Sequence, residues 1–222
     1  MKSIEIDKVD ARSVLMKIAE EFKTTYNREY GEYFLNIPTR FGKGFICGIN
    51  FPNGIGLFQF EVVFKESRCF DFCGLEVHPF KFLYVIEGDL KHQFCDEQIT
   101  HEISQGQSVI LEVDRRKFVD QLTFPLEEMD EIYHRIFADT NAIRTLYHHT
   151  QYSLKMAYLV QELKQFNAQG LEKVSFHGAK ALELLTYMLM LYKDDNKSEE
   201  HQNILRERDL EKIKNIVNKI DQ

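Results

Sequence analysis

The sequence lacks the features that mark a membrane or secreted protein. None of its apolar runs approaches the roughly 20 residues that a membrane-spanning helix needs. Residues 1–7 show neither the apolar core nor the small-residue cleavage site of a secretory signal. We therefore expect a cytoplasmic protein with no membrane partner.

Cysteine is scarce, and its spacing does not favour cross-links. The four cysteines, Cys47, Cys69, Cys73 and Cys95, lie in apolar or aromatic contexts, and a chain of 222 residues does not need disulfide staples. We expect buried, reduced thiols. Cys69 and Cys73 followed by His78 could form half of a zinc site, but structural zinc needs four ligands and no second cysteine pair is present.

Paired metal-binding histidines are missing. A metal-dependent cupin enzyme needs His-x-His with a glutamate and a further histidine, whereas residues 89–94 contain only His92. His148 and His149 are adjacent, about 100° apart on the helix expected there, and cannot readily share a metal. No nucleophile elbow, phosphate-binding loop or dinucleotide fingerprint occurs. We expect no catalytic residues, no metal and no cofactor.

Positive charge is also in short supply. The chain has 28 Lys and Arg against 35 Asp and Glu, a formal net charge of −7. Because nucleic-acid affinity comes largely from clustered basic residues, this chain should bind duplex DNA poorly. The 44% hydrophobic and 28% charged residues are typical of a globular protein, and the length corresponds to about one and a half typical domains.

Turn-forming residues are confined to one part of the chain. All four prolines and nine of the eleven glycines fall between Gly31 and Pro125, and 14 of the 18 phenylalanines lie between Phe34 and Phe124. Turn formers at short spacing around aromatic runs predict antiparallel strands, and a long stretch without them predicts helices. We predict an α+β fold with an antiparallel β-barrel over about 35–124 and helices over about 125–192.

Within the first part, apolar side chains alternate from Phe58 to Phe64 and again from Phe80 to Ile86. Glu87–Asp89 would form a hairpin loop before a strand that includes Leu90, His92 and Phe94, because glycine tolerates the backbone angles of a tight turn. Further strands are expected at 45–51, 98–103, 108–113 and 117–124, with Gly106 in a turn. Asp10 would cap a preceding helix whose inner side carries Val14, Ile18 and Phe22.

The second part predicts a series of helices. One begins at Pro125, two more span 139–149 and 153–166, and Gly170 breaks the chain before a helix at 179–192. That last helix is apolar around nearly its whole circumference, which implies two packing partners, the second being another subunit; the alternative is a helix wholly buried in one chain. The expected dimerisation residues are Leu182, Leu185, Met188, Leu189 and Tyr192.

Residues 193–208 are polar and read as a linker. Asp209 can cap a last helix with one apolar stripe, made by Leu210, Ile213, Val217 and Ile220. An amphipathic helix that ends without a partner element suggests that the chain is cut within a second domain, although a natural truncation is the alternative.

At this point the residues resemble a known family. The run Ala179–Leu185, the segment Leu205–Ile213 and the segment Leu35–Gly44 are similar to the N-terminal part of AraC-family transcription regulators, in the branch of siderophore-responsive activators. The resemblance implies an effector-binding and dimerisation domain over 1–192 with a cupin-like barrel. It also implies that 209–222 is the first helix of a DNA-binding domain whose helix-turn-helix recognition helices are missing.

If the barrel binds an effector, its inner wall supplies the site. Alternation nominates the aromatic residues and one histidine of the strands: Phe58, Phe60, Phe82, Tyr84, His92 and Phe94. Tyr84 and His92 would orient the ligand, whereas the competing interpretation is a filled core.

We expect a homodimer with an unidentified small-molecule effector that contacts DNA only through the missing module. The rival hypotheses are a stand-alone cupin-type enzyme or small-molecule carrier, and an interaction domain with no ligand.

Overall fold

The computed structural model describes residues 3–73, 75, 78–95, 98–141, 146–150 and 153–196. For 89–90, 92–95, 98–99, 146–147 and 149–150 it describes the backbone alone. The predicted helix at 209–222 and the predicted linker beyond residue 196 lie outside the described residues.

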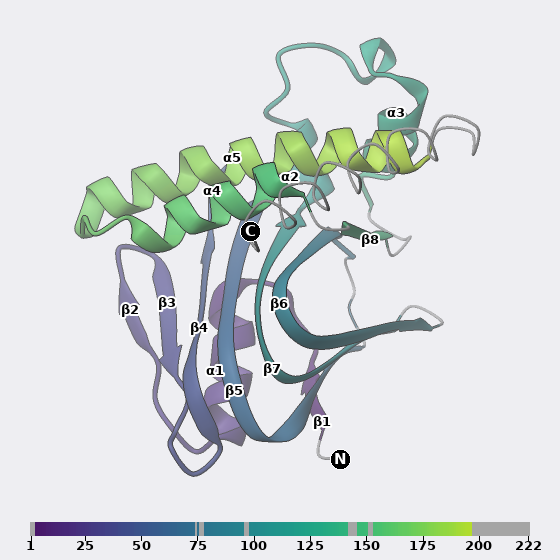
Figure 1. The fold of residues 1–222 in the computed structure, drawn as a ribbon. Helices are drawn as coiled ribbons and strands as arrows, with labels where there is room; N and C mark the ends of the chain where they lie inside the picture. The colour runs from purple at the N-terminus through teal and green to yellow at the C-terminus, as the bar shows by residue number, and fades with distance from the viewer. Residues whose placement is uncertain are drawn as a thin grey trace, which may run out of the picture.

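The fold is α+β, with one bent sheet that carries helices on both faces (Figure 1). The strands are β1 (Ser3–Ile6), β2 (Asn27–Glu29), β3 (Glu32–Asn36), β4 (Gly42–Asn50), β5 (Ile55–Phe72), β6 (Phe80–Cys95), β7 (Gln98–Val113) and β8 (Leu146–Thr150). Their order is β2-β3-β4-β5-β7-β6-β8, with β1 also beside β5. The β1–β5 and β6–β8 pairs are parallel and the others antiparallel. Among the described residues β2 and β8 do not pair, so the sheet is open and a closed barrel is not confirmed.

The helices are α1 (Ala11–Glu21), α2 (Arg115–Val119), the short 3-10 helix η1 (Leu126–Glu128), α3 (Glu131–Phe137), α4 (Leu154–Gln165) and α5 (Gly170–Asp195). Figure 1 shows α4 and α5 side by side across one face of the sheet and α1 on the other. The predicted helix at 153–166 is therefore confirmed as α4, and the one at 179–192 is part of the longer α5.

Helix α1, which the sequence predicts, covers one face of the sheet. The side chain of Asp10 caps it by accepting a hydrogen bond from the Ser13 backbone N–H at 3.0 Å. Val14, Ile18 and Phe22 are buried in a core with inward-facing side chains of the sheet. This surface is called the α1 face below.

Helices α4 and α5 cover the opposite face. Their core with the sheet is almost entirely apolar; its largest fully buried members include Phe80, Phe82 and Tyr84, all from one side of β6. This surface is called the α4–α5 face. The long strands thus alternate their side chains between two separate cores, because successive residues of a strand point to opposite sides.

Three glycines mark the line along which the sheet bends. Gly44, Val62, Gly106 and Gly88 are paired in a row across four strands. A Cβ atom at Gly44 would lie 1.9 Å from the Glu61 carbonyl oxygen, and one at Gly88 would lie 2.3 Å from that of Gln105. The predicted turns at Glu87–Asp89 and Gly106 are therefore wrong: β6 and β7 run through both positions, and glycine permits the close approach and the bulges of a bent sheet.

Three predictions in the connecting segments are wrong. Residues 117–124 do not form a strand, because Asp114 caps α2 by accepting a hydrogen bond from the Lys117 N–H at 3.2 Å. The predicted helix at 139–149 is wrong in its last residues, since 146–150 are strand β8, paired with Phe80–Tyr84 of β6. The predicted helix start at about 179 is also wrong, because α5 begins at Gly170, which has a φ of 64° and follows the break after α4. The predicted helix at Pro125 is confirmed only as η1 and α3.

Candidate ligand pocket on the α1 face

The aromatic residues predicted to bind an effector do not share one surface. Phe58 and Phe60 of β5 belong to the core on the α1 face, whereas Phe82 and Tyr84 of β6 belong to the core on the α4–α5 face. All four are buried. The structure therefore does not bring these residues together around one cavity, and each packs in a filled core.

Tyr84 has a structural partner. Its hydroxyl donates a hydrogen bond to the Ser153 carbonyl oxygen at 3.0 Å, at the residue that precedes α4. This bond fixes the start of α4 on β6. The predicted residues His92 and Phe94 lie in β6, where the side chains are outside the described residues.

The residues predicted to form a dimer divide between the two sides of α5. Leu185 and Met188 are buried against the sheet of their own chain, and Leu189 and Tyr192 pack partly against the same core. Leu182 lies on the outer side and is 47% exposed. The outer side, rather than the whole circumference, is therefore the part of α5 available to a second subunit.

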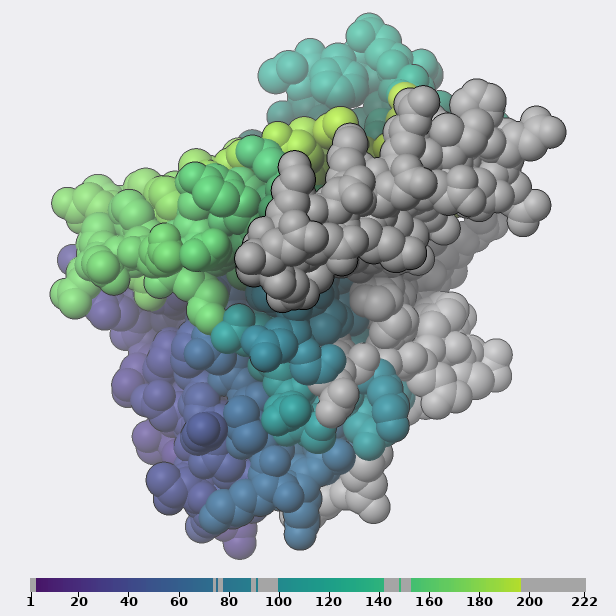
Figure 2. All heavy atoms as spheres, viewed as in Figure 1, coloured from purple at the N-terminus to yellow at the C-terminus, as the bar shows by residue number. Residues whose placement is uncertain are grey.

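Large apolar side chains are also exposed on the outer surfaces of both helices. Leu171, Leu182 and Met190 of α5 and Leu154 and Tyr158 of α4 are large exposed hydrophobic residues. Figure 2 shows the outer surface of α4 and α5, in green to yellow, along the upper part of the molecule. This set of five residues is called the outer stripe below.

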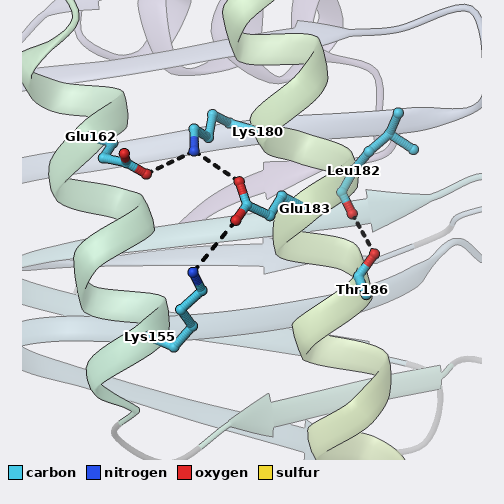
Figure 3. A network of polar contacts seen from close by, with 6 residues as sticks. All are labelled: Lys155, Glu162, Lys180, Leu182, Glu183 and Thr186. Carbon is cyan, nitrogen blue, oxygen red and sulfur yellow. Dashed lines mark hydrogen bonds and ion pairs between the residues drawn. The ribbon is translucent and has the colours of Figure 1, made fainter.

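Charged residues join the two helices beside this stripe (Figure 3). The Lys180 ammonium group contacts Glu162 of α4 at 2.7 Å and Glu183 of its own helix at 2.8 Å, and Lys155 reaches Glu183 at 3.7 Å. The hydrogen bonds raise the pKa of Lys180 and lower that of Glu183. The four side chains tie α4 to α5, so the outer stripe lies on a braced pair of helices.

A cavity with a volume of about 640 Å³ opens at one end of the α1 face. Four parts of the chain line it: the loop between β1 and α1, the β4–β5 turn, the segment before β6, and the end of β7 with the start of α2. The lining residues are Asp7, Lys8, Val9, Asp10, Asn50, Phe51, Gly54, Leu75, Pro79, Glu112, Asp114 and Lys117. This cavity is called the α1-face pocket.

A buried ion pair underlies the α1-face pocket. Glu112 of β7 lines it and is 4% exposed, and Oε1 of Glu112 accepts a hydrogen bond from the Lys81 ammonium group. Lys81 lies opposite Glu112 in the β6–β7 register, is 1% exposed, and has its nitrogen 3.6 Å from the Phe72 ring centre. Burial raises the pKa of Glu112, although Lys81 acts in the opposite direction. The pocket thus has a charged group in a site that excludes much of the water.

The polar residues at the rim are mostly engaged with the backbone. Asp10 and Asp114 cap α1 and α2, and Asp114 also pairs with Lys117 at 3.3 Å. Oδ1 of Asn50 accepts a hydrogen bond from the Ala11 N–H at 2.7 Å. These bonds fix the rim, so the shape of the pocket is set before a ligand enters.

One pocket residue also touches the opposite face. Phe51, in the β4–β5 turn, packs partly against the core of the α4–α5 face. A methyl group placed at Gly178 of α5 would lie only 3.3 Å from the Phe51 ring. Phe51 is therefore a direct contact between the pocket and the helix that carries part of the outer stripe.

A second polar cluster lies between α5 and β3. Glu32 pairs with Lys173, and its Oε1 is 3.7 Å from Nδ1 of His177, which is 3% exposed. Burial lowers the pKa of His177 and, with Glu32, raises the pKa of the nearby Cys47 thiol to about 12. Cys47, Cys69 and Cys73 are free thiols. No group of three metal-ligating side chains occurs in the described part of the chain.

Sequence reasoning did not find the α1-face pocket. Lys81 and Glu112 sit at alternating positions of strands and look like solvent-facing residues, so only their pairing across β6 and β7 reveals a buried pair. One signal in the sequence could have located part of the rim. Asp114 before Arg-Arg-Lys is a helix-capping pattern like the one that identified Asp10, and it predicts the start of α2.

Among the described residues, no helix has both the length and the apolar content to cross a membrane. No family model, curated protein or solved structure matches the chain.

Proposed function

We propose that this chain is the effector-sensing and dimerising part of an AraC-family DNA-binding transcription regulator. In this proposal the bent sheet is a cupin-like sensor, and DNA is contacted through a helix-turn-helix module outside these 222 residues. The sequence resemblance supplies the family, and the contact between Phe51 and Gly178 is the observation that carries the mechanism, because it joins a pocket to the helix of the outer stripe.

The pocket supports a sensing role through its position. A ligand against Phe51 would favour one placement of α5 over another, and a ligand shifts an equilibrium only by its difference in affinity for the two states. The ligand and the second subunit would then affect one another through the same helix. We therefore place the effector in the α1-face pocket. It takes the place of the site predicted from Phe58, Phe60, Phe82 and Tyr84.

The outer stripe supports the homodimer. Large apolar side chains exposed on one helix offer surface to a partner, and Leu182 and Met190 are 47% and 53% exposed on α5. Substituting both, Leu182→Glu with Met190→Lys, should convert a dimer into a monomer in sedimentation at tens of micromolar. Val63→Lys, at an apolar position that is 40% exposed on β5, is the matched control and should leave the dimer intact.

A strictly monomeric wild-type chain in the same sedimentation experiment would contradict the dimer. A longer chain that carries the DNA-binding module should also bind DNA, with an affinity that changes when the pocket is filled. If neither the oligomeric state nor DNA binding responds to pocket variants, the regulator proposal fails.

The second candidate is a stand-alone small-molecule-binding protein or enzyme with a cupin-like sheet. The α1-face pocket itself favours it, since a cavity of about 640 Å³ suits a small ligand whatever its use. Metal analysis of the purified protein separates the two, because stoichiometric iron, zinc or manganese would support an enzyme.

A further inference from the structure

We propose that the α1-face pocket binds a small primary amine with an apolar body, whose ammonium group is held by Glu112. Binding of the amine does not depend on the proposed function. Only the regulatory effect of that binding rests on it. Glu112 is the anchor, and Phe51, Leu75 and Pro79 form the apolar wall.

The first reason is the buried pair beneath the pocket. Taking a carboxylate and an ammonium group out of water is unfavourable, and a well-packed apolar pair of similar volume is often as stable or more stable. Lys81 and Glu112 are nevertheless 1% and 4% exposed. A role for Glu112 beyond stability explains why a carboxylate occupies this position, on a side of the sheet whose other inward-facing residues are largely apolar.

The second reason is the acceptor capacity of Glu112. Two carboxylate oxygens offer about four lone-pair sites, and Lys81 takes a hydrogen bond at Oε1. Glu112 lines the pocket, and Oε2 is the carboxylate oxygen that would accept a hydrogen bond from a donor that enters. A donor with positive charge gives the stronger bond, because hydrogen bonds between ionised groups are roughly twice as strong as neutral ones.

The third reason is the balance of charge around the cavity. Its lining has four carboxylates, Asp7, Asp10, Glu112 and Asp114, against the two lysines Lys8 and Lys117. Two of the carboxylates cap helices and one of those also pairs with Lys117, but Asp7 has no ion pair among the described residues. With Lys81, which pairs with Glu112, the carboxylates still outnumber the lysines by one. A ligand carboxylate or phosphate would add to this negative charge, whereas an ammonium group would balance it.

The wall opposite the charge determines the body of the ligand. Val9, Phe51, Leu75 and Pro79 supply apolar surface, and the Phe51 ring can also attract a cation through its face. A compact hydrocarbon or aromatic body can pack against these side chains. A ligand with an ammonium group at one end and an apolar group at the other matches both parts of the pocket.

The test is calorimetry on the full 222-residue chain with three matched sets of probes. Each set has one body, phenylethyl, hexyl or cyclohexylmethyl, and carries an amine, a hydroxyl or a carboxylate. At least one amine should bind, its alcohol should bind about tenfold more weakly or worse, and its carboxylate should not bind measurably. Binding by none of the amines, or carboxylates that bind as well as the amines, would overturn the proposal.

Variants locate the bound amine. Glu112→Gln should weaken amine binding by about tenfold or more. Because that variant leaves Lys81 unpaired, the double variant Lys81→Met with Glu112→Leu serves as a folded alternative, and it should also lose amine binding while keeping its circular-dichroism spectrum and a cooperative melt. Glu66→Gln, an exposed residue of β5 outside the pocket, is the control and should bind as the wild type does. Unchanged affinity in the folded double variant would place the amine elsewhere.

The same ligands and variants, tested by sedimentation on the 222-residue chain and by DNA binding on a longer chain that carries the DNA-binding module, keep the two proposals apart. If amines bind in a Glu112-dependent manner but sedimentation and DNA binding do not respond, the pocket assignment holds and the regulator proposal fails. If a ligand that is not an amine drives the regulatory response, the regulator stands and the amine proposal fails.

Discussion

The two faces of the bent sheet are built from the same strands but are covered to different extents. The α4–α5 face is packed with aromatic and aliphatic side chains under two long helices. The α1 face is also largely apolar, but its single short helix leaves the end of the sheet open, where a buried ion pair underlies a pocket. The amount of helix laid over a sheet therefore decides which face can admit a ligand.

The difference also assigns separate tasks to the faces. The braced helices on one side offer an outer stripe to a partner, whereas the pocket on the other offers a charged anchor to a ligand. Phe51 is the residue that contacts both sides. Each prediction below tests whether this division is real.

The largest loss of stability is expected from a substitution in the core of the α4–α5 face. Phe82→Ala removes a ring that is fully buried on the α4–α5 face, and such a substitution lowers the free energy of unfolding by about 3–5 kcal/mol. Phe124→Ala, at a position that is 43% exposed, is the control and should change it by less than about 0.5 kcal/mol. Chemical denaturation measures both, and a small effect at Phe82 would mean that this face is loosely packed.

The ion pair on the α1 face should respond in a different way. Lys81→Met alone leaves Glu112 buried without its partner and should lower the free energy of unfolding by about 3 kcal/mol. Adding Glu112→Leu should restore most of that loss, because an apolar pair replaces the charged one. Denaturant midpoints of the single and double variants give the comparison. A double variant that is as unstable as the single one would show that the pair is needed for the fold itself.

The sequence predicted the elements of this fold better than their arrangement. Alternation at Phe58 and Phe82 identified strands and their two sides, and Asp10 identified the first helix. What alternation cannot supply is which helix covers which side, because that depends on contacts between distant parts of the chain. Phe58 and Phe82 were therefore assigned to one cavity although they face different cores.

The misassigned glycines have a related cause. Gly88 and Gly106 tolerate unusual backbone angles, which is a signal for a turn and equally for a bulge in a bent strand. Only the pairing of Gly88 with Gly106 across two strands separates the two. The pocket was missed for the same reason, since a lysine and a glutamate become a buried pair only once β6 and β7 are in register.

His177 is a buried polar residue on the α4–α5 side. It should make the free energy of unfolding depend on pH, with a smaller effect than the substitutions above. Burial lowers the pKa of His177 below its ordinary value of 6.5, with Glu32 opposing and Lys173 adding to the shift. The unfolded chain then binds a proton that the folded chain resists, so stability present above pH 6.5 is lost as the pH falls toward the folded pKa. His177→Leu should reduce this loss in melts between about pH 7 and pH 5.

His148 shares the direction of that shift, since burial lowers its pKa as well. The His177→Leu variant should therefore keep part of the pH dependence rather than lose all of it. His134→Leu on α3, away from Glu32, is the control. Identical pH profiles for the wild type and His177→Leu would show that His177 titrates normally in the folded chain.

The smallest change in stability, and the sharpest test of the link between the faces, is expected at Gly178. Replacing a glycine inside a helix with alanine favours the helix by about 1 kcal/mol, but the new methyl group would lie 3.3 Å from the Phe51 ring. The ring of Phe51, which also lines the pocket, must move by a few tenths of an ångström. The two effects therefore partly cancel, and the melting temperature should change little. Affinity for the pocket ligand should nonetheless fall measurably in calorimetry. Ala179→Ser, one residue along on the exposed side of α5, should leave the affinity unchanged, and an equal response of both variants would mean that Phe51 does not connect the pocket to the helix.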